Sequence, residues 1–192
     1  EDAFLRETLV VMDGQVDRLN YLVGDMLDLS KMKAGSLDLV REPVVLNDLL
    51  RAVVDEMSVT NPEHIIQLCC EQQALVLADK HRIHQVVHNL LTNAVKYAPA
   101  SRTIEVRSTV TEDAVTVAVR DHGIGIRPAD QEKIFQRFFR VEGNNERTYP
   151  GFGIGLYIAA DIVRRHHGQI GVTSALGEGS TFHFALPLAN VA

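Results

Sequence analysis

Apolar residues at the start of the chain recur at alternating spacings of four and three. That spacing is typical of a helix that packs in a coiled coil or four-helix bundle. We therefore predict a long amphipathic helix from Ala3 to Lys33, ended by Ala34-Gly35. A single helix that lies back on its own domain is the alternative. The repeating positions are Leu5, Leu9, Met12, Val16, Leu19, Val23 and Met26.

The pattern then changes to shorter elements. An extended segment with Pro43 leads into a helix over 46–58, for which Asn47 is the expected N-cap. Runs rich in β-branched and apolar residues at 65–70 and 75–78 predict two strands joined as a hairpin.

Helices and strands continue to alternate to the end of the chain. Asp79 is the expected cap of the next helix, and Pro99 is its expected stop. These patterns predict an α+β fold, a two-layer α/β sandwich with helices on one face of a mixed sheet. The later elements are strands at 103–110 and 115–120, a short helix at 129–138, a helix at 157–165 and two closing strands.

Two asparagines lie one helical turn apart on the helix that follows Asp79. Asn89 and Asn93 occupy positions i and i+4, so both amides and Lys96 can point at one ligand. An amide oxygen is a hard ligand that suits a Mg²⁺ still carrying waters and phosphate oxygens. The alternative is a pair of exposed amides with no ligand.

Three glycine-rich stretches follow this helix. The first, 121–126, begins with Asp121 at a strand end, where a carboxylate can accept hydrogen bonds from an exocyclic amine such as that of adenine. The second, 151–156, leads into a helix whose first N–H groups can meet phosphates. The third, 177–181, precedes the last strand. Together with the asparagines, these stretches predict a nucleotide site.

Two other phosphate-binding motifs are excluded or disfavoured. The chain has no Gly-x-x-x-x-Gly-Lys-Ser/Thr run, which excludes a P-loop. The spacing of Gly153, Gly155 and Ala159 is similar to a dinucleotide fingerprint, but that motif must follow a strand. The preceding residues 143–150 are polar and loop-like.

In this order the segments resemble the ATP-binding domain of sensor histidine kinases. That superfamily also contains gyrase, mismatch-repair ATPases and heat-shock chaperones of the ninety-kilodalton class. The resemblance spans nearly all 192 residues. The matching segments are His88–Tyr97 (asparagine box), Asp121–Ile126 (first glycine box), Ile134–Arg140 (phenylalanine box), Gly151–Leu156 (second glycine box) and Gly177–Thr181 (last glycine box).

The resemblance implies roles for the matching residues. Asn93 resembles the Mg²⁺ ligand, with Asn89 beside it, and both are expected to be catalytic. Lys96 resembles a phosphate contact, Tyr97 a contact near the base or ribose, and Asp121 the adenine-reading carboxylate. The glycine boxes add the expected nucleotide contacts Gly123, Gly125, Ile126, Gly151, Phe152, Gly153, Ile154, Gly155, Leu156 and Thr181.

The phenylalanine box and the segment after it are expected to serve the γ-phosphate. Arg140, and with it Arg137, resemble cations that stabilise charge spreading over the oxygens during transfer. Solvated ends of a short helix are the alternative for both. Residues 141–152 resemble the ATP lid, which we expect to be mobile until phosphate is present. Phe135, Phe138 and Phe139 are expected to be packing anchors.

The residue at position 89 bears on the reaction. In hydrolysing relatives the resemblance places a glutamate there, which can activate water, whereas the Asn89 amide cannot take up a proton at neutral pH. The expected reaction is therefore γ-phosphoryl transfer to a histidine, followed by relay to a response-regulator aspartate. The alternative is a non-catalytic, nucleotide-dependent dimerisation or conformational switch. A serine kinase of the anti-sigma type shares the site but is disfavoured by the N-terminal helix.

The phosphate-accepting histidine is not expected within these residues. Residues 25–35 resemble the end of the second helix of the kinase dimerisation hairpin, so 1–35 is a partial dimerisation helix and 36–192 the ATP-binding catalytic domain. In the resembled family an acidic residue follows the acceptor, and none of the eight histidines here precedes Asp or Glu. The chain begins at Glu1 and so looks like a piece of a longer protein, in which we expect a homodimer.

Composition limits the remaining possibilities. A net charge of -6 argues against a nucleic-acid partner. No apolar run reaches 18 residues and no signal peptide is present, so we expect a cytoplasmic location, as the cytoplasmic part of a membrane sensor if the parent has one. Adjacent Cys69 and Cys70 are expected to be reduced. His81, His84 and His88 share a helix face, but a solvated face explains them better than a metal site.

Overall fold

The computed structural model describes residues 12, 23–24, 26–30, 32, 38–98, 101–141 and 152–189. The chain divides into two compact units, Glu1–Asp38 and Leu39–Ala192. In the first unit, residues 12, 23–24, 26–30 and 32 are helical, and the rest of the predicted N-terminal helix lies outside the described residues. Three positions of its apolar repeat, Met12, Val23 and Met26, are 56–59 % exposed.

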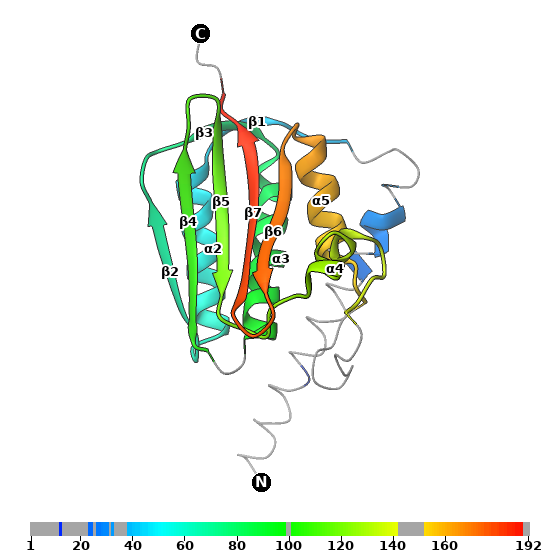
Figure 1. Cartoon of the computed structure of the whole chain (residues 1–192). Helices are drawn as coiled ribbons and strands as arrows, with labels where there is room; N and C mark the ends of the chain where they lie inside the picture. Colours follow the sequence, from blue (N-terminus) through cyan, green and yellow to red (C-terminus); the bar gives the residue numbers. More distant parts are fainter. Residues whose placement is uncertain are drawn as a thin grey trace. The chain divides into compact units, whose positions relative to one another are not determined.

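The second unit is built on a five-stranded mixed sheet, in the order β2-β4-β5-β7-β6 (Figure 1). β2 pairs with β4 in parallel, and the other neighbours are antiparallel. The strands are β2 (Ile65–Cys70), β4 (Thr103–Val110), β5 (Ala114–Asp121), β6 (Gln169–Ala175) and β7 (Gly179–Pro187). The predicted mixed sheet is confirmed.

Helices cover one face of this sheet (Figure 1). They are α2 (Leu46–Thr60), α3 (Lys80–Tyr97) and α5 (Gly155–Arg165). Alternate residues of β5 and β7 point under them, so Val117 and its cross-strand partner Phe184 are fully buried. From α3, Ile83 and Leu90 enter the same core with no exposed surface. Burial of these side chains is the main stabilising term of the predicted two-layer sandwich.

The predicted hairpin between the strands at 65–70 and 75–78 is wrong, although both strands form at those bounds. β3 (Leu75–Ala78) pairs instead with β1 (Glu42–Val45) in a separate antiparallel sheet. The predicted cap Asn47 is also wrong, because Val45 occupies the N-cap position of α2. The Asn47 amide instead donates to the Gln72 carbonyl and accepts from the Ala74 N–H, each at 2.9 Å. These two bonds hold the chain after β2 against the start of α2, so β3 is directed away from β2.

The other predicted boundaries need smaller changes. Asp79 caps α3 as expected, with Oδ1 accepting from the Arg82 N–H at 3.1 Å. The expected helix at 129–138 is shorter, comprising α4 (Pro128–Gln131) and the 3₁₀ turn η1 (Lys133–Phe135). It ends at Phe135 because the next residue, Gln136, is extended, with φ −82° and ψ 148°.

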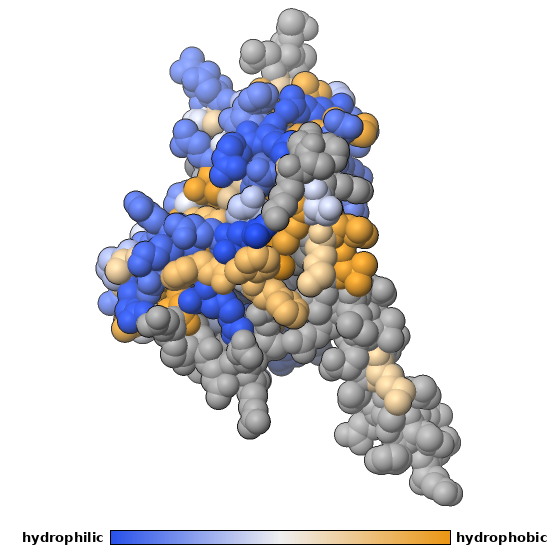
Figure 2. All heavy atoms as spheres, turned by 90° about the vertical axis from the view of Figure 1, so that its right-hand side faces the viewer, coloured by the Kyte–Doolittle hydropathy of each residue, from blue (hydrophilic) through white to orange (hydrophobic). Residues whose placement is uncertain are grey.

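The C-terminal end of α5 lies at the opposite end of the domain from Tyr97. Figure 2 shows hydrophilic side chains gathered toward the top of the face that it draws. Arg164 and Arg165 form the last turn of α5. Both arginines bond to Asp161 one turn earlier, at 3.2 and 2.6 Å. Basic residues at this position also complement the helix dipole.

Candidate functional site

The asparagine box and the second glycine box meet in space. The Asn89 side-chain amide on α3 donates to the Gly155 carbonyl at the start of α5, at 3.1 Å. Since a carbonyl only accepts, this bond uses the amide nitrogen and leaves the Asn89 oxygen for another partner. Asn93 lies one turn further along the same helix and is half-buried.

The start of α5 can receive an anion. Ile154 is its N-cap residue, and its side chain makes no capping hydrogen bond. The N–H groups of the first turn of a helix have no intrahelical partner, and the helix dipole is positive there. The arrangement therefore suits a phosphate group next to Asn89.

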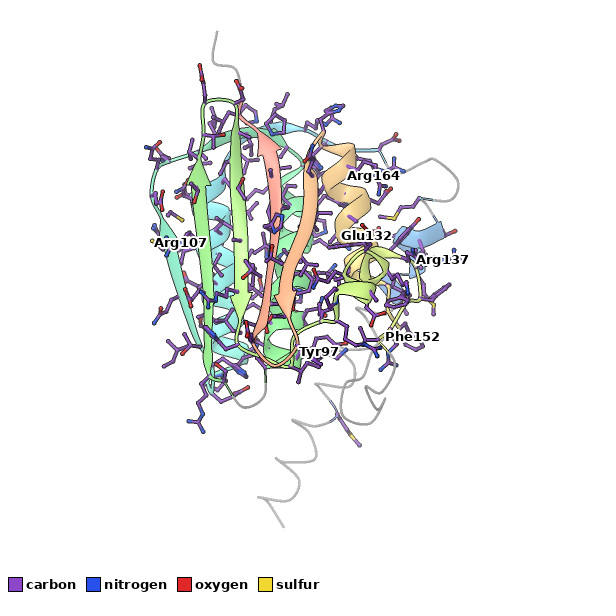
Figure 3. The ribbon with its side chains drawn as sticks, viewed as in Figure 1. Tyr97, Arg107, Glu132, Arg137, Phe152 and Arg164 are labelled. Atoms are coloured by element: carbon purple, nitrogen blue, oxygen red, sulfur yellow. The ribbon has the colours of Figure 1, made fainter. Side chains whose placement is uncertain are left out.

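The end of α3 meets the first glycine box. The Ile124 N–H donates to the Tyr97 carbonyl at 3.2 Å, which brings the residues after β5 against the last turn of α3. Lys96 Nζ lies 4.6 Å from the centroid of the Tyr97 ring. Figure 3 shows Tyr97 and Phe152 toward the same end of the domain, with Arg164 toward the other.

Asp121 is a buried carboxyl group at the end of β5, only 3 % exposed. Its Oδ1 accepts from the Gly123 N–H at 2.9 Å and from the Ser180 N–H at 3.2 Å. Burial raises the pKa of Asp121, and these two hydrogen bonds and nearby His122 oppose the rise. Within the described part of the chain, Oδ2 takes no hydrogen bond, so this oxygen can accept from a ligand.

Gly125 allows the first and last glycine boxes to interlock. It has φ +68°, and a Cβ at this position would lie 1.9 Å from the Ala175 carbonyl oxygen. No other residue fits there without moving the backbone. The Gly177 N–H then donates to the Ile124 carbonyl at 2.8 Å, which ties the turn between β6 and β7 to the loop after β5.

The phenylalanine box and the second glycine box are joined by a backbone bond. The Phe138 N–H donates to the Gly153 carbonyl at 2.9 Å, and both residues have positive φ, +64° and +69°. A non-glycine residue in this conformation is strained, which often marks a functional position. The two residues bracket the expected lid, of which residues 142–151, including Gly151, lie outside the described residues.

The two arginines of the phenylalanine box lie beside this junction. The Arg137 guanidinium is 4.5 Å from the centroid of the Phe138 ring, and Arg140 is half-buried. Both follow the end of η1, and the Arg137 side chain is exposed there. Phe138 and Phe152 are 54 % and 53 % exposed, which makes Phe138 a surface residue and not the expected packing anchor.

The structure places Ser180, and not the neighbouring Thr181, beside Asp121. In the pairing of β5 with β7, Asp121 lies opposite Ser180, and Arg120 lies opposite Thr181. Because side chains alternate along a strand, Thr181 points to the face away from Asp121. Ser180 is 6 % exposed, and its side chain lies on the same face of β7 as the inward-facing Phe182. The sequence carried this signal, since Ser180 has the same parity as the inward-facing Phe182.

The histidines of α3 lie outside this constellation. His84 Nε2 is 3.0 Å from a carboxylate oxygen of Glu56 on α2, and the His84 ring stacks on His88 with centroids 6.3 Å apart. Burial lowers the pKa of His88. Only His81 has the solvated position expected for all three. Across 38–98, 101–141 and 152–189, no group of three metal-ligating side chains forms.

Comparison with known proteins shows the family of this chain. Residues 78–190 match the family described as "Histidine kinase-, DNA gyrase B-, and HSP90-like ATPase". The chain is 33% identical over 183 residues to the sensor histidine kinase WalK of Bacillus subtilis (strain 168), covering 93% of the chain and 30% of the relative. It is 31% identical over 190 residues to the sensor histidine kinase MtrB of Mycobacterium tuberculosis (strain CDC 1551 / Oshkosh), a match that covers 97% of the chain and 33% of that relative. The chain thus spans about a third of these relatives' length.

Solved structures agree with this assignment. Full-length ShkA, in complex with AMPPNP, superposes with a TM-score of 0.78 at 30% identity, covering 92% of this chain and 37% of that one. The mycobacterial sensor histidine kinase MprB superposes with a TM-score of 0.69 at 26% identity, covering 78% of this chain and 98% of that one. The chain therefore belongs to the histidine kinase-, DNA gyrase B- and HSP90-like ATPase family, and it carries the ATP-binding domain of a sensor histidine kinase.

Proposed function

We propose that the site between α3, the loop after β5 and the start of α5 binds Mg-ATP and delivers its γ-phosphoryl group to a histidine of a dimerisation hairpin. A response-regulator aspartate would then accept the phosphoryl group. The observation that carries the proposal is the junction of Asn89 with Gly155, because it joins the expected metal-binding turn to the expected phosphate-binding helix start. ATP and Mg²⁺ are the proposed cofactors.

The residues present fit a magnesium ion. The bond to Gly155 uses the nitrogen of Asn89, so its oxygen is left to face a cation, and Asn93 offers a second amide on the same helix face. Mg²⁺ takes few protein ligands and keeps waters and phosphate oxygens. The ion would screen the charge of the transferring phosphoryl group.

The other groups have matching proposed roles. Asp121 Oδ2 would accept from the exocyclic amine of adenine, while Lys96 and Tyr97, at the end of α3, would contact the phosphates and the ribose or base. Arg140 and Arg137 would approach the γ-phosphate from the junction of Phe138 with Gly153. The first turn of α5 supplies backbone N–H groups.

Transfer is proposed in preference to hydrolysis. Asn89 stands where a general base would activate water, and an amide does not take up a proton at neutral pH. A carboxylate at this position would change the reaction, because it could accept a proton from water.

The proposed setting is a homodimeric sensor kinase with a response regulator as partner. The exposed apolar side chains of Met12, Val23 and Met26 support dimerisation, because such a stripe is stabilised by packing against another helix. We propose a cytoplasmic location for this domain, within a membrane-bound parent if one exists. Among the described residues, no helix is long and apolar enough to cross a bilayer.

Trans-phosphorylation with a separate hairpin tests the proposal. The chain is mixed with γ-labelled ATP, Mg²⁺ and a purified two-helix dimerisation hairpin that carries an acceptor histidine, and acid-labile phosphohistidine is measured. We expect labelled hairpin, no label on the chain itself, and little phosphate release. The matched variant Asn89→Asp should release more phosphate. Nucleotide binding without any transfer would instead favour a nucleotide-dependent conformational switch.

A further inference from the structure

Ser174 on β6 lies at the centre of a hydrogen-bond network that none of the roles above uses. Its hydroxyl oxygen is 2.8 Å from the Ile126 nitrogen, 2.8 Å from the Gly179 carbonyl oxygen and 3.0 Å from the Ser180 hydroxyl oxygen. The partners belong to the first and last glycine boxes. One side chain therefore connects the two segments that flank Asp121.

The direction of each bond follows from the number of protons available. The Gly179 carbonyl can only accept, so the single hydroxyl proton of Ser174 points to it. The Ile126 N–H can only donate, so it occupies one lone pair of Ser174. The contact with Ser180 must then run from the Ser180 hydroxyl to the second lone pair of Ser174. Ser180 has no second proton, so its oxygen faces every other partner as an acceptor.

Gln131 holds this network in place from α4. Its side-chain amide donates to the Ser174 carbonyl at 2.7 Å and to the Ile126 carbonyl at 3.2 Å. The backbones of Ser174 and Ile126 are thus fixed on both sides of the Ser174 hydroxyl. A preorganised group of this kind keeps its orientation when a ligand arrives.

The oriented hydroxyl lies next to the base-reading carboxylate. Ser180 is the cross-strand partner of Asp121, and its backbone N–H bonds to Asp121 Oδ1. When ionised, the carboxylate is also acceptor-only. Asp121 at the end of β5 and Ser180 at the start of β7 therefore present neighbouring acceptors, which suits a base edge that carries N–H donors.

We propose that Ser174 is a positioning residue that determines base selectivity by holding the Ser180 hydroxyl as an acceptor. This inference rests on the proposed nucleotide function. A purine with an exocyclic amine at this edge is bound, and a purine with a carbonyl oxygen there meets only acceptors. Without Ser174, the Ser180 hydroxyl can rotate and donate to such an oxygen, so discrimination between the two purines falls.

Competition between ATP and GTP for the variant Ser174→Ala tests this role. We expect ATP to bind less tightly and the ratio of the GTP to the ATP dissociation constant to fall about tenfold, since one hydrogen bond to a charged or oriented group is worth roughly that factor. A merely structural role would weaken both nucleotides equally and leave the ratio unchanged. That unchanged ratio would overturn the inference.

Two further variants make the test decisive. Ser108→Ala is the matched control, because Ser108 is a buried serine on β4 whose hydroxyl has no hydrogen-bond partner among the described residues. It should leave the ratio as in the wild type. In a Ser180→Ala background, Ser174→Ala should change the ratio no further, because the hydroxyl that it orients is gone. A further fall in that background would contradict the mechanism.

The test also separates this inference from the proposed function. If the wild-type chain, shown to be folded by circular dichroism, bound no adenine nucleotide, the proposed function would fail. If it bound ATP and the variants kept the wild-type ratio, only the role of Ser174 would fail. Should Ser174→Ala not fold, Gln131→Glu gives a second measurement, because a carboxylate cannot donate to the Ser174 and Ile126 carbonyls. It should lower the ratio in the same direction, and an unchanged ratio would overturn the inference.

Discussion

The two ends of the proposed nucleotide site are built differently. At the base end, the loop after β5 is held to β6, β7 and α4 by bonds that involve Asp121, Ser174, Ser180 and Gln131. At the phosphate end, the chain on either side of the expected lid is joined by the Phe138 to Gly153 backbone bond. Both of those residues are in left-handed conformations.

This difference indicates separate tasks. A base pocket gains selectivity when its polar groups are fixed before the ligand arrives, because no ordering cost remains at binding. A phosphate end must admit the nucleotide and then place charge around a transferring group. Variants at the base end should therefore change binding and selectivity, and variants at the phosphate end should change transfer.

The largest expected effect is at the metal-binding turn. Asn93→Ala removes an amide oxygen proposed to bind Mg²⁺, so we expect transfer to a hairpin histidine to fall about 100-fold or more. Initial rates with γ-labelled ATP measure this. Thr92→Ala is the control, since Thr92 is exposed and its hydroxyl bonds within α3 to the His88 carbonyl at 2.8 Å. A near-normal transfer rate for Asn93→Ala would show that Mg²⁺ does not bind at this turn.

The next effect is at the base end. Asp121→Asn removes the charge and can place N–H donors where the site needs acceptors, so we expect ATP to bind about 30-fold more weakly. Calorimetry with ATP measures the change. Asp113→Asn, in the exposed turn between β4 and β5, should bind as the wild type does. Equal affinities for both variants would show that Asp121 does not read the base.

A smaller effect is expected at the lid junction. Gly153 has φ +69°, and a Cβ there would lie 2.6 Å from the Phe139 carbonyl oxygen, so Gly153→Ala must disturb the bond to Phe138. We expect affinity for ATP to fall about tenfold. Affinity for adenosine should not change, because the base end is intact. Equal losses for ATP and adenosine would mean that the two ends are not separable.

A pH dependence is expected from a residue outside both ends. His166 is 3 % exposed, and its Nε2 accepts from the Asp79 N–H at 2.9 Å while Nδ1 faces the Ile162 carbonyl at 2.8 Å. The ring is therefore neutral in the folded chain. Burial, together with Arg41 and His167, lowers the pKa of His166, against the opposing effects of Ile162 and Asp79.

The lowered pKa of His166 determines whether stability rises or falls with pH. The lowered pKa means that His166 takes up a proton more readily in the unfolded chain than in the folded one. Its contribution to the free energy of unfolding is therefore fully present above the ordinary histidine pKa of 6.5, and it is lost as the pH falls below 6.5. Between about pH 7.5 and about pH 5.5, the free energy of unfolding measured in urea should drop less for His166→Gln than for the wild type. His88 also has a lowered pKa and adds a background common to both proteins. His81→Gln, at an exposed position, should keep the wild-type drop.

The smallest expected effect is a gain in stability. His167 has φ +60° at the end of α5, where the Gly168 N–H bonds back to the Val163 carbonyl at 2.9 Å. Glycine adopts this conformation without strain, so His167→Gly should raise the free energy of unfolding by ~0.5–1 kcal/mol. Nucleotide affinity should be unchanged, because the site lies at the other end of α5. A loss of stability in urea unfolding would contradict this account.

The local elements were predictable because their causes are local. The bounds of the strands at 65–70 and 75–78, and the cap at Asp79, follow from residue types close together in the chain. The asparagine pair and the glycine boxes were visible for the same reason, since helical spacing and backbone freedom are local properties. Their order in the chain was sufficient to predict the family.

Other features depend on contacts between distant residues. From residue type alone, Asn47 could equally have capped α2. Only the nearby backbone groups of Gln72 and Ala74 make its side chain hydrogen-bond to the loop after β2 instead. The role of Ser174 could not be predicted, because its partner Ile126 lies 48 residues away. The choice of Ser180 over Thr181 depends on the register of β5 with β7.

The amino-acid sequence by itself determined which segments become helix, strand or glycine turn, because side-chain periodicity and capping act over one or two turns of chain. The tertiary structure decided which strands pair and which hydroxyl group lies beside Asp121. Those outcomes depend on burying the common core of β5, β7 and α3, and that burial fixes the register between residues far apart in the chain.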